Sequence, residues 1–228
     1  MTKRFIAVAG SIGAGKSSLV HRLAERLEWQ PFFEPVAENP YLADFYRDMA
    51  AWAFHSQVFF LSNRLRSLRQ IVEHPNSVVQ DRSVYEDAEI FACNLYRQGY
   101  MSERDYQSYH SLYESILPFL PAPDLVVYLR ARVDTLQGRI LRRGRDFERE
   151  IPRAYLEALD ALYEEWLGSF NLCPVLMVPA DDLDFVRHAA HLDLVLAKVK
   201  ERLMGQSEVV FGAEELASIN SHLPGEAP

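Results

Sequence analysis

The sequence predicts an α/β fold, in which helices cover both faces of a central, mostly parallel five-stranded sheet. Short apolar runs recur along the chain without alternating polar positions, as expected for parallel strands that are buried on both faces. Longer stretches with apolar residues at helical spacing separate these runs. With 228 residues, 49% of them hydrophobic, the chain is long enough for one domain of this class.

The elements follow one another in a regular order. A first strand is predicted over residues 5–9, followed by a glycine-rich loop and a helix over residues 17–27. A second strand is expected to end at Glu34, and further strands are predicted at 77–79, 125–129 and 174–178. Helices are predicted over residues 41–73, 84–117, 132–144, 152–170 and 183–204.

Residues 1–204 are predicted to form a single domain, and residues 205–228 a mobile acidic tail. After Gly205 the apolar pattern is lost, and glutamates occur without any lysine or arginine. A short apolar stretch at 209–211 could dock on the domain.

Charge and cysteine content exclude several classes of protein. The net charge of -8 argues against a nucleic-acid polymer or an anionic membrane as partner, since both favour a basic surface. Cys93 and Cys173 are far apart and have no metal-site spacing, which suits a reducing cytoplasm. The apolar start is interrupted at once by glycines, so we expect no signal peptide, and no segment is long enough for a transmembrane span. We therefore expect a cytoplasmic protein.

Residues 10–18, GSIGAGKSS, fit the phosphate-binding pattern G-x-x-x-x-G-K-[ST]. The glycines let backbone N–H groups point at phosphates, Lys16 reaches the outer phosphates, and Ser17 offers a hydroxyl to Mg²⁺. No guanine-reading [NT]-K-x-D element occurs, and Asp81 is followed by Arg82 rather than by a second acid. The predicted ATP-binding residues of the loop are Gly10, Ser11, Ile12, Gly13, Ala14, Gly15, Lys16, Ser17 and Ser18.

Glu34 is the candidate general base. A carboxylate at the end of a sheet strand faces the crevice of an open α/β fold, where it can accept a proton from an attacking hydroxyl. Taken alone, Glu34 is better explained as a surface residue before a proline. The elements that follow it favour the catalytic interpretation.

These elements, in their order, resemble the deoxyribonucleoside kinase family over about residues 5–185. They are GSIGAGKSS, Glu34-Pro35-Val36, Tyr46 with Trp52, Gln57 and Arg64, Asp81-Arg82-Ser83 with Asp87 and Phe91, and Arg139, Arg143-Gly144-Arg145 and Glu148. The resemblance implies a three-layer P-loop kinase sandwich with an arginine-rich lid. It also implies ATP and Mg²⁺ as cofactors, a deoxynucleoside substrate, a role in nucleotide salvage and a homodimer.

The resemblance implies a role for each matching residue. The catalytic residues would be Glu34, as base on the 5'-hydroxyl, with Arg82, Lys16 and Arg143. The deoxynucleoside would contact Glu34, Tyr46, Gln57, Arg64, Arg82, Asp87, Phe91 and Glu148; Tyr46 and Glu148 would read the 3'-hydroxyl and Phe91 would stack on the base. Arg139, Arg143 and Arg145 would close over ATP, and Ser17 with Asp81 would hold Mg²⁺ directly or through water.

Residue spacing supports the predicted base pocket independently. Gln57, Phe60 and Arg64 share one helical face, and an amide matches the donor and acceptor pair of adenine or of cytosine. Two positions depart from the family: Asp81 stands where glutamate is frequent, and Ser56 stands where the better-known animal enzymes carry an aromatic residue, which predicts a roomier base pocket.

We expect deoxyadenosine as the favoured substrate, with deoxycytidine as a second one. A deoxyguanosine or broad-specificity deoxynucleoside kinase is the alternative. A thymidylate-type monophosphate kinase would need a phosphate-binding arginine near Glu34, and Arg47 is the candidate there. A protein that binds ATP without transferring phosphate is a third interpretation.

Overall fold

The computed structural model describes residues 2–34, 38–149 and 151–221. A five-stranded sheet with the order β2-β3-β1-β4-β5 forms its centre, and every strand pair is parallel. The strands are β1 (Phe5–Ala9), β2 (Gln30–Phe32), β3 (Val78–Asp81), β4 (Leu125–Arg130) and β5 (Val175–Pro179). The predicted α/β class is confirmed, with an entirely parallel sheet.

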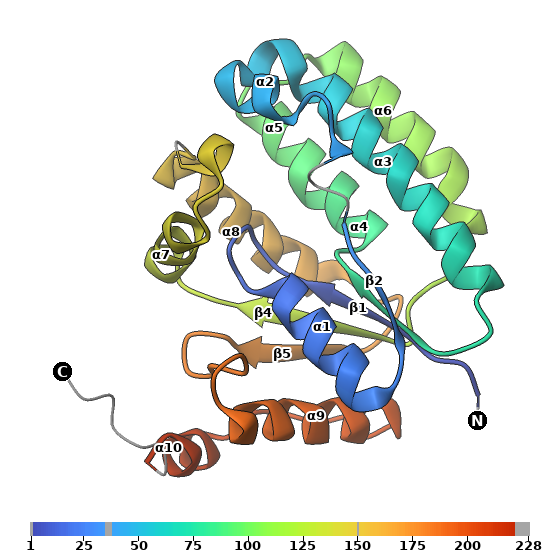
Figure 1. Ribbon diagram of the computed structural model, residues 1–228. Coiled ribbons are helices and arrows are strands. Elements are labelled where there is room, and N and C mark those ends of the chain that lie inside the picture. The colour runs from blue at the N-terminus through green and yellow to red at the C-terminus, as the bar shows by residue number, and fades with distance from the viewer. Residues whose placement is uncertain (1, 35–37, 150, 222–228) are drawn as a thin grey trace.

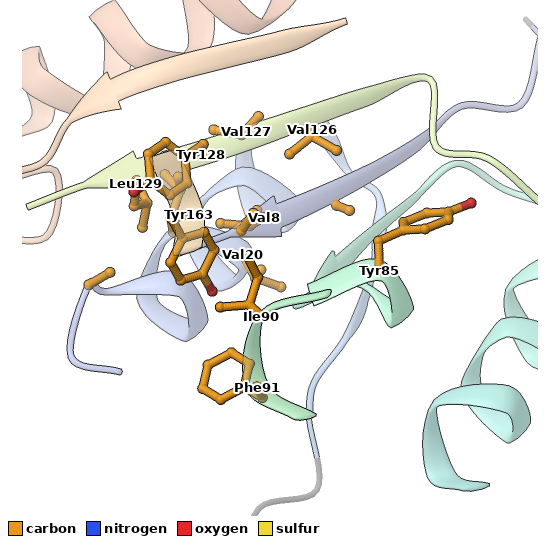
Figure 2. Packing of buried hydrophobic residues seen from close by; sticks show 14 of the residues in the cluster. Val8, Val20, Tyr85, Ile90, Phe91, Val126, Val127, Tyr128, Leu129 and Tyr163 are labelled. Atoms are coloured by element: carbon orange, nitrogen blue, oxygen red, sulfur yellow. The ribbon is translucent and has the colours of Figure 1, made fainter. Parts of the chain in front are cut away.

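Helices form a layer on each face of this sheet (Figure 1). Helices α1 and α9 lie on one face and are joined by the ion pair of Arg26 with Asp193, at 3.1 Å. Helix α8 crosses the other face, where Tyr163 packs on Tyr128 of β4 (Figure 2). The helices are α1 (Lys16–Leu27), α2 (Leu42–Arg47), α3 (Met49–Glu73), α4 (Val84–Glu86), the π-helix η2 (Asp87–Ala92), α5 (Cys93–Arg97), α6 (Glu103–Ile116), η3 (Leu117–Phe119), α7 (Val133–Arg143), η4 (Asp146–Glu148), α8 (Arg153–Ser169), α9 (Ala189–Leu203) and α10 (Ala213–Ser221).

Two long predicted helices are divided in the structure. The helix predicted over 41–73 breaks at Asp48, whose side chain caps α3 by accepting a hydrogen bond from Ala51 N at 3.1 Å. The helix predicted over 84–117 breaks at Gly99, which has a positive φ of 75°, and Ser102 caps α6. Polar capping residues inside an apolar pattern therefore set these boundaries.

The C-terminal part of the chain also differs from the prediction. The helix predicted over 183–204 begins only at Ala189, so residues 183–188 form a loop after β5. The segment after Gly205, in which the sequence shows no apolar pattern and for which we predicted no helix, contains α10. Residues 222–228 of the predicted tail lie outside the described residues, and the mobility of the tail stays a prediction. None of the helices in the described part of the chain is long and apolar enough to cross a membrane.

Candidate active site

The glycine-rich loop joins β1 to α1 and wraps around the start of that helix. Gly10, Gly13 and Gly15 all have positive φ, at 143°, 85° and 103°, a conformation that other residues adopt only with strain. A Cβ atom on Gly13 would lie 2.7 Å from the carbonyl oxygen of Leu136 in α7. The loop therefore needs glycine both for its turn and for close approach of α7.

Lys16 is the first residue of α1 and is buried at the bottom of the loop. Its Nζ donates to the carbonyl oxygens of Gly10 and Ser11, at 2.9 and 3.0 Å. Burial, together with the nearby charge of Arg82, lowers the pKa of Lys16 to about 8. Two carbonyl oxygens of the loop thus hold the Lys16 side chain in place, and the residue lines both cavities at the start of α1, where an anion would bind.

Two cavities meet at this loop. The acceptor cavity lies between the loop and helices α2, α3 and η2. The donor cavity lies between the loop, α7 and the loop before α9. Both are lined by Gly13, Lys16, Ser17, Arg143 and Arg145. A group bound at this shared wall is accessible from both cavities.

Most of the predicted substrate residues line the acceptor cavity. They are Glu34, Tyr46, Gln57, Arg82, Asp87, Phe91 and Glu148, together with Leu42, Phe45, Phe60 and Tyr155. Arg64 lies behind Glu34 and Asp87, is 4% exposed and is ion-paired with both. Pro35 and Val36, which belong to the motif around Glu34, lie outside the described residues. The structure thus brings the described substrate-site residues together.

A buried ion-pair network organises the cavity floor. Arg64 donates to Glu34 Oε1 at 2.8 Å, to Asp87 Oδ2 at 2.9 Å and to the carbonyl oxygen of Asp81 at 2.9 Å. Arg82 Nε lies 3.3 Å from the same Glu34 oxygen. Among the described residues no hydrogen bond to Glu34 Oε2 is found, so this oxygen can accept one from a bound hydroxyl.

The pKa values of the two carboxylates in this network shift in opposite directions. Burial alone would raise the pKa of Glu34, but the charges of Arg82, Arg64 and Lys16 lower it below its usual value. Burial raises the pKa of Asp87 to about 6, because Arg64 compensates the lost hydration only in part. Glu34 is therefore an ionised proton acceptor at neutral pH, whereas Asp87 titrates near the physiological range.

The π-helix η2 positions two of these side chains. In a π-helix the turn is wider than in an α-helix, and such turns are frequent at functional sites. Asp87 and Phe91 both face the acceptor cavity from η2. The guanidinium carbon of Arg82 lies 3.9 Å from the centre of the Phe91 ring, so Arg82 covers one face of this ring.

Helix α3 closes the end of the acceptor cavity that is predicted to receive the nucleobase. Gln57 is 4% exposed and its side chain lines the acceptor cavity. Ser56 does not line it: its hydroxyl accepts a hydrogen bond from Asn39 Nδ2 at 3.1 Å, in the interior. Ser56 therefore does not contact the cavity, and a roomier base pocket stays a prediction.

Helix α7 and the turn after it carry the predicted arginine lid. Arg143 and Arg145 both donate to the buried carboxylate of Glu148, and Arg139 donates to the carbonyl oxygens of Ala14 and Ala180, at 2.9 and 2.6 Å. Arg139 therefore ties α7 to the glycine-rich loop, and Arg143 and Arg145 face both cavities. Sequence reasoning missed Arg142, which lines the donor cavity from the same cluster.

The pair of Ser17 and Asp81 fits a magnesium site. Ser17 Oγ donates to Asp81 Oδ2 at 2.5 Å, while the buried Asp81 Oδ1 has no hydrogen-bond partner in the described chain. A hydroxyl and a carboxylate beside a phosphate site are hard oxygen ligands of the kind that Mg²⁺ prefers. No cluster of three or more His, Cys, Asp or Glu able to hold a metal occurs among the described residues, so this site would depend on phosphate oxygens and water.

Sequence reasoning missed Glu86 behind the glycine-rich loop. Glu86 is fully buried and accepts hydrogen bonds from Gly10 N at 3.1 Å and from the hydroxyl of Tyr163 at 2.8 Å. It also forms a capping box with Ser83. The spacing Ser83-x-x-Glu86 was the available signal, and it identifies a structural carboxylate that fixes the start of the loop.

Arg47, the candidate phosphate ligand of a monophosphate kinase, lies away from the site. It pairs with Asp44 at 3.1 Å, its side chain is 78% exposed, and it lines neither the acceptor nor the donor cavity. Arg47 therefore does not supply the extra cation that a phosphorylated acceptor would need.

Comparisons with known proteins agree with this geometry. The family model described as deoxynucleoside kinase matches residues 6–204. The deoxyadenosine/deoxycytidine kinase of Bacillus subtilis is 39% identical over 196 residues, which cover 85% of this chain and 90% of the relative. The deoxyadenosine kinase of Lactobacillus acidophilus is 36% identical, over 87% of this chain and 95% of the relative. Deoxyguanosine kinases also occur among the relatives, one of them 32% identical.

The fold is likewise shared with solved structures. A deoxyadenosine kinase from M. mycoides, with dCMP and a flexible dCDP bound, superposes with a TM-score of 0.78 at 32% sequence identity. The match covers 86% of this chain and 99% of that structure.

Proposed function

Because the chain belongs to the deoxynucleoside kinase family, we propose that it transfers the γ-phosphoryl group of ATP to the 5'-hydroxyl of deoxyadenosine, with deoxycytidine as a second substrate. One observation carries this proposal. Gln57 and Asp87 face a cavity that also contains Glu34 and meets the glycine-rich loop. An amide and a carboxylate together suit the exocyclic amino group and ring nitrogen that adenine and cytosine share.

The transfer step follows from the positions of Glu34 and the shared wall. Glu34 accepts the proton of the 5'-hydroxyl while the oxygen forms a bond to the γ-phosphorus, and the bond from that phosphorus to the β,γ-bridging oxygen breaks. The products are the 5'-monophosphate and ADP, and Glu34 releases the proton to water. Arg82 holds the 5' end of the deoxynucleoside, and Tyr46 with Glu148 orients the sugar.

Lys16, Arg143 and Arg145 stabilise the charge that spreads over the transferring group. They reach the shared wall from two sides, and positive charge placed there before reaction needs no rearrangement. When phosphate binds, Arg143 and Arg145 would exchange part of their hydrogen bonds to Glu148 for bonds to phosphate oxygens. This closes the lid and excludes water.

Ser17 and Asp81 would hold Mg²⁺, directly or through water. The ion supplies charge neutralisation and alignment of the phosphate chain. The orphaned Oδ1 of Asp81 supports this assignment.

A comparison of the four deoxynucleosides tests the proposal. With ATP and magnesium, kcat/KM is expected to be highest for deoxyadenosine and next for deoxycytidine. A clear preference for thymidine or deoxyguanosine would contradict it. Deoxyadenosine monophosphate should not be a substrate, since Arg47 does not face the cavity.

The pH dependence of KM tests the role of Asp87. Since its pKa is raised to about 6, Asp87 is ionised above this pH and accepts hydrogen bonds from the amino group of the base. As the pH falls through about 6, the carboxyl becomes protonated, and KM for deoxyadenosine is expected to rise. Steady-state kinetics between pH 5 and 8, with ATP saturating, measure this; a KM that is constant over the range would remove Asp87 from base recognition.

The homodimer, the cytoplasmic location and the role in nucleotide salvage stay predictions. Family membership supports each of them, and sedimentation of the purified chain would measure the oligomeric state.

A further inference from the structure

The loop between β5 and α9 forms one wall of the donor cavity. Leu183, Asp184, Phe185 and Val186 line that cavity opposite the arginines of α7. The ring of Phe185 packs on the glycine-rich loop, because a Cβ atom added to Gly15 would lie 3.4 Å from its Cζ. The position of this loop therefore sets the width of the cavity that would receive the donor nucleotide.

Hydrogen bonds fix the inner part of this loop. Asp184 Oδ1 accepts from the backbone N–H groups of Val186 and Arg187, at 3.1 and 2.9 Å. The backbone N–H of Asp184 donates to Nδ1 of the buried His191 at 2.8 Å, which ties the loop to the first turn of α9. The wall is thus attached to α9 at one end.

Helix α10 contacts the same loop from outside the cavity. After α9 the chain turns back, so that α10 lies beside the start of α9 (Figure 1). Asn220 Nδ2 donates to the carbonyl oxygen of Asp182 at 3.2 Å, and Glu215 pairs with Lys198 of α9 at 3.3 Å. Leu216 and Ile219 are half-buried and pack against the hydrophobic core.

This helix lies outside the part of the chain that the family model matches, which ends at residue 204. We infer that α10 is a positioning element for the donor nucleotide: by bracing the loop at Asp182, it holds the far wall of the donor cavity in its binding conformation. The inference rests on the proposed function, because it takes the donor cavity as the ATP site. None of the α10 residues lines either the donor or the acceptor cavity, so the effect acts through the loop alone.

The expected effect concerns ATP and not the deoxynucleoside. If the loop occupies its binding conformation for only a fraction of the time, the apparent Kd for ATP rises by the inverse of that fraction. Loss of α10 docking is expected to raise KM and Kd for ATP by roughly threefold to tenfold. The KM for deoxyadenosine, measured at saturating ATP, and kcat should remain unchanged.

A pair of charge-insertion variants of the full chain tests this. Leu216→Asp with Ile219→Asp places charges on the docked face of α10, whereas Ala213→Asp with Ala217→Asp adds the same charges at exposed positions of the same helix. The first variant is expected to raise KM and Kd for ATP, and the second is expected to match the unmodified protein. Equal values of Kd for ATP in the two variants would overturn the inference, as would an equal rise in KM for deoxyadenosine.

Asn220→Ala provides a second, milder variant that retains the packing of α10. It removes the contact with Asp182 and is expected to raise Kd for ATP by a smaller factor, measured by titration calorimetry; an unchanged Kd would assign no bracing role to this contact. ATP binding by the unmodified protein distinguishes a failure of the proposed function from a failure of this inference. If the unmodified protein binds no ATP, the proposed function fails. If it binds ATP and the α10 variants bind ATP equally well, only this inference is contradicted.

Discussion

Replacing Glu34 with glutamine is expected to lower kcat by about two to four orders of magnitude, the range that a positioned general base contributes. Glutamine keeps the shape of the side chain but cannot accept the proton of the 5'-hydroxyl. Since the donor cavity does not include Glu34, the Kd for ATP should change little. Rapid-quench or steady-state assays with deoxyadenosine, beside calorimetry with ATP, measure the two quantities separately.

Glu165→Gln is the matched control for this variant. Glu165 is also ion-paired with an arginine, Arg97, at 2.9 Å, but the pair is exposed and lines neither the acceptor nor the donor cavity. This control should retain full activity. Turnover of the Glu34→Gln variant within tenfold of the unmodified enzyme would mean that another group accepts the proton.

Replacing Arg64 with methionine is expected to cause the largest loss of stability. Burial alone would lower the pKa of Arg64, but Asp87 and Glu34 raise it above its usual value, so the guanidinium is strongly held in its charged form. Removing one partner of such a buried pair leaves charge uncompensated and costs about 3–5 kcal/mol. Urea unfolding at neutral pH, with a fixed slope, measures this difference.

The pH dependence of this loss identifies its cause. Without Arg64, the pKa of Asp87 rises further, so the folded variant binds a proton that the unfolded chain does not, and its stability falls as the pH rises. The difference in free energy of unfolding between the unmodified protein and the Arg64→Met variant should therefore be smaller at pH 5 than at pH 8. Arg69→Met, which removes an exposed pair with Glu73 on the same helix, should leave the unfolding midpoint unchanged. An equal loss of stability in Arg64→Met and Arg69→Met would show that the buried ion-pair network contributes little to the free energy of unfolding.

The site could be predicted from the sequence to the extent that local motifs define it. The glycine-rich loop depends on short-range backbone geometry, so its residues and the buried Lys16 followed from the pattern alone. The clustering of Glu34, Gln57 and Asp87 could be predicted only from the resemblance to the family, because these residues come from three separate elements. Their charge network, with Arg64 shared by two carboxylates, needed the structure.

Other features left a weak signal or none. The breaks at Asp48 and Gly99 lie inside continuous helical patterns, where a single capping residue or positive φ decides the boundary. The π-helix η2 does not follow the 3.6-residue period by which an α-helix is recognised in a sequence. Helix α10 is short, acidic and without a fully buried residue, so its apolar pattern did not distinguish it from a tail.

The most direct test of the central claim follows the labelled γ-phosphate of ATP. The enzyme is incubated with γ-labelled ATP, magnesium and deoxyadenosine, and the products are separated by chromatography. We expect the label to appear in deoxyadenosine 5'-monophosphate, and 2',5'-dideoxyadenosine, which lacks the attacking hydroxyl, to receive none. Label recovered only as inorganic phosphate, or transferred to the analogue as readily, would contradict transfer to the 5'-oxygen across the shared wall.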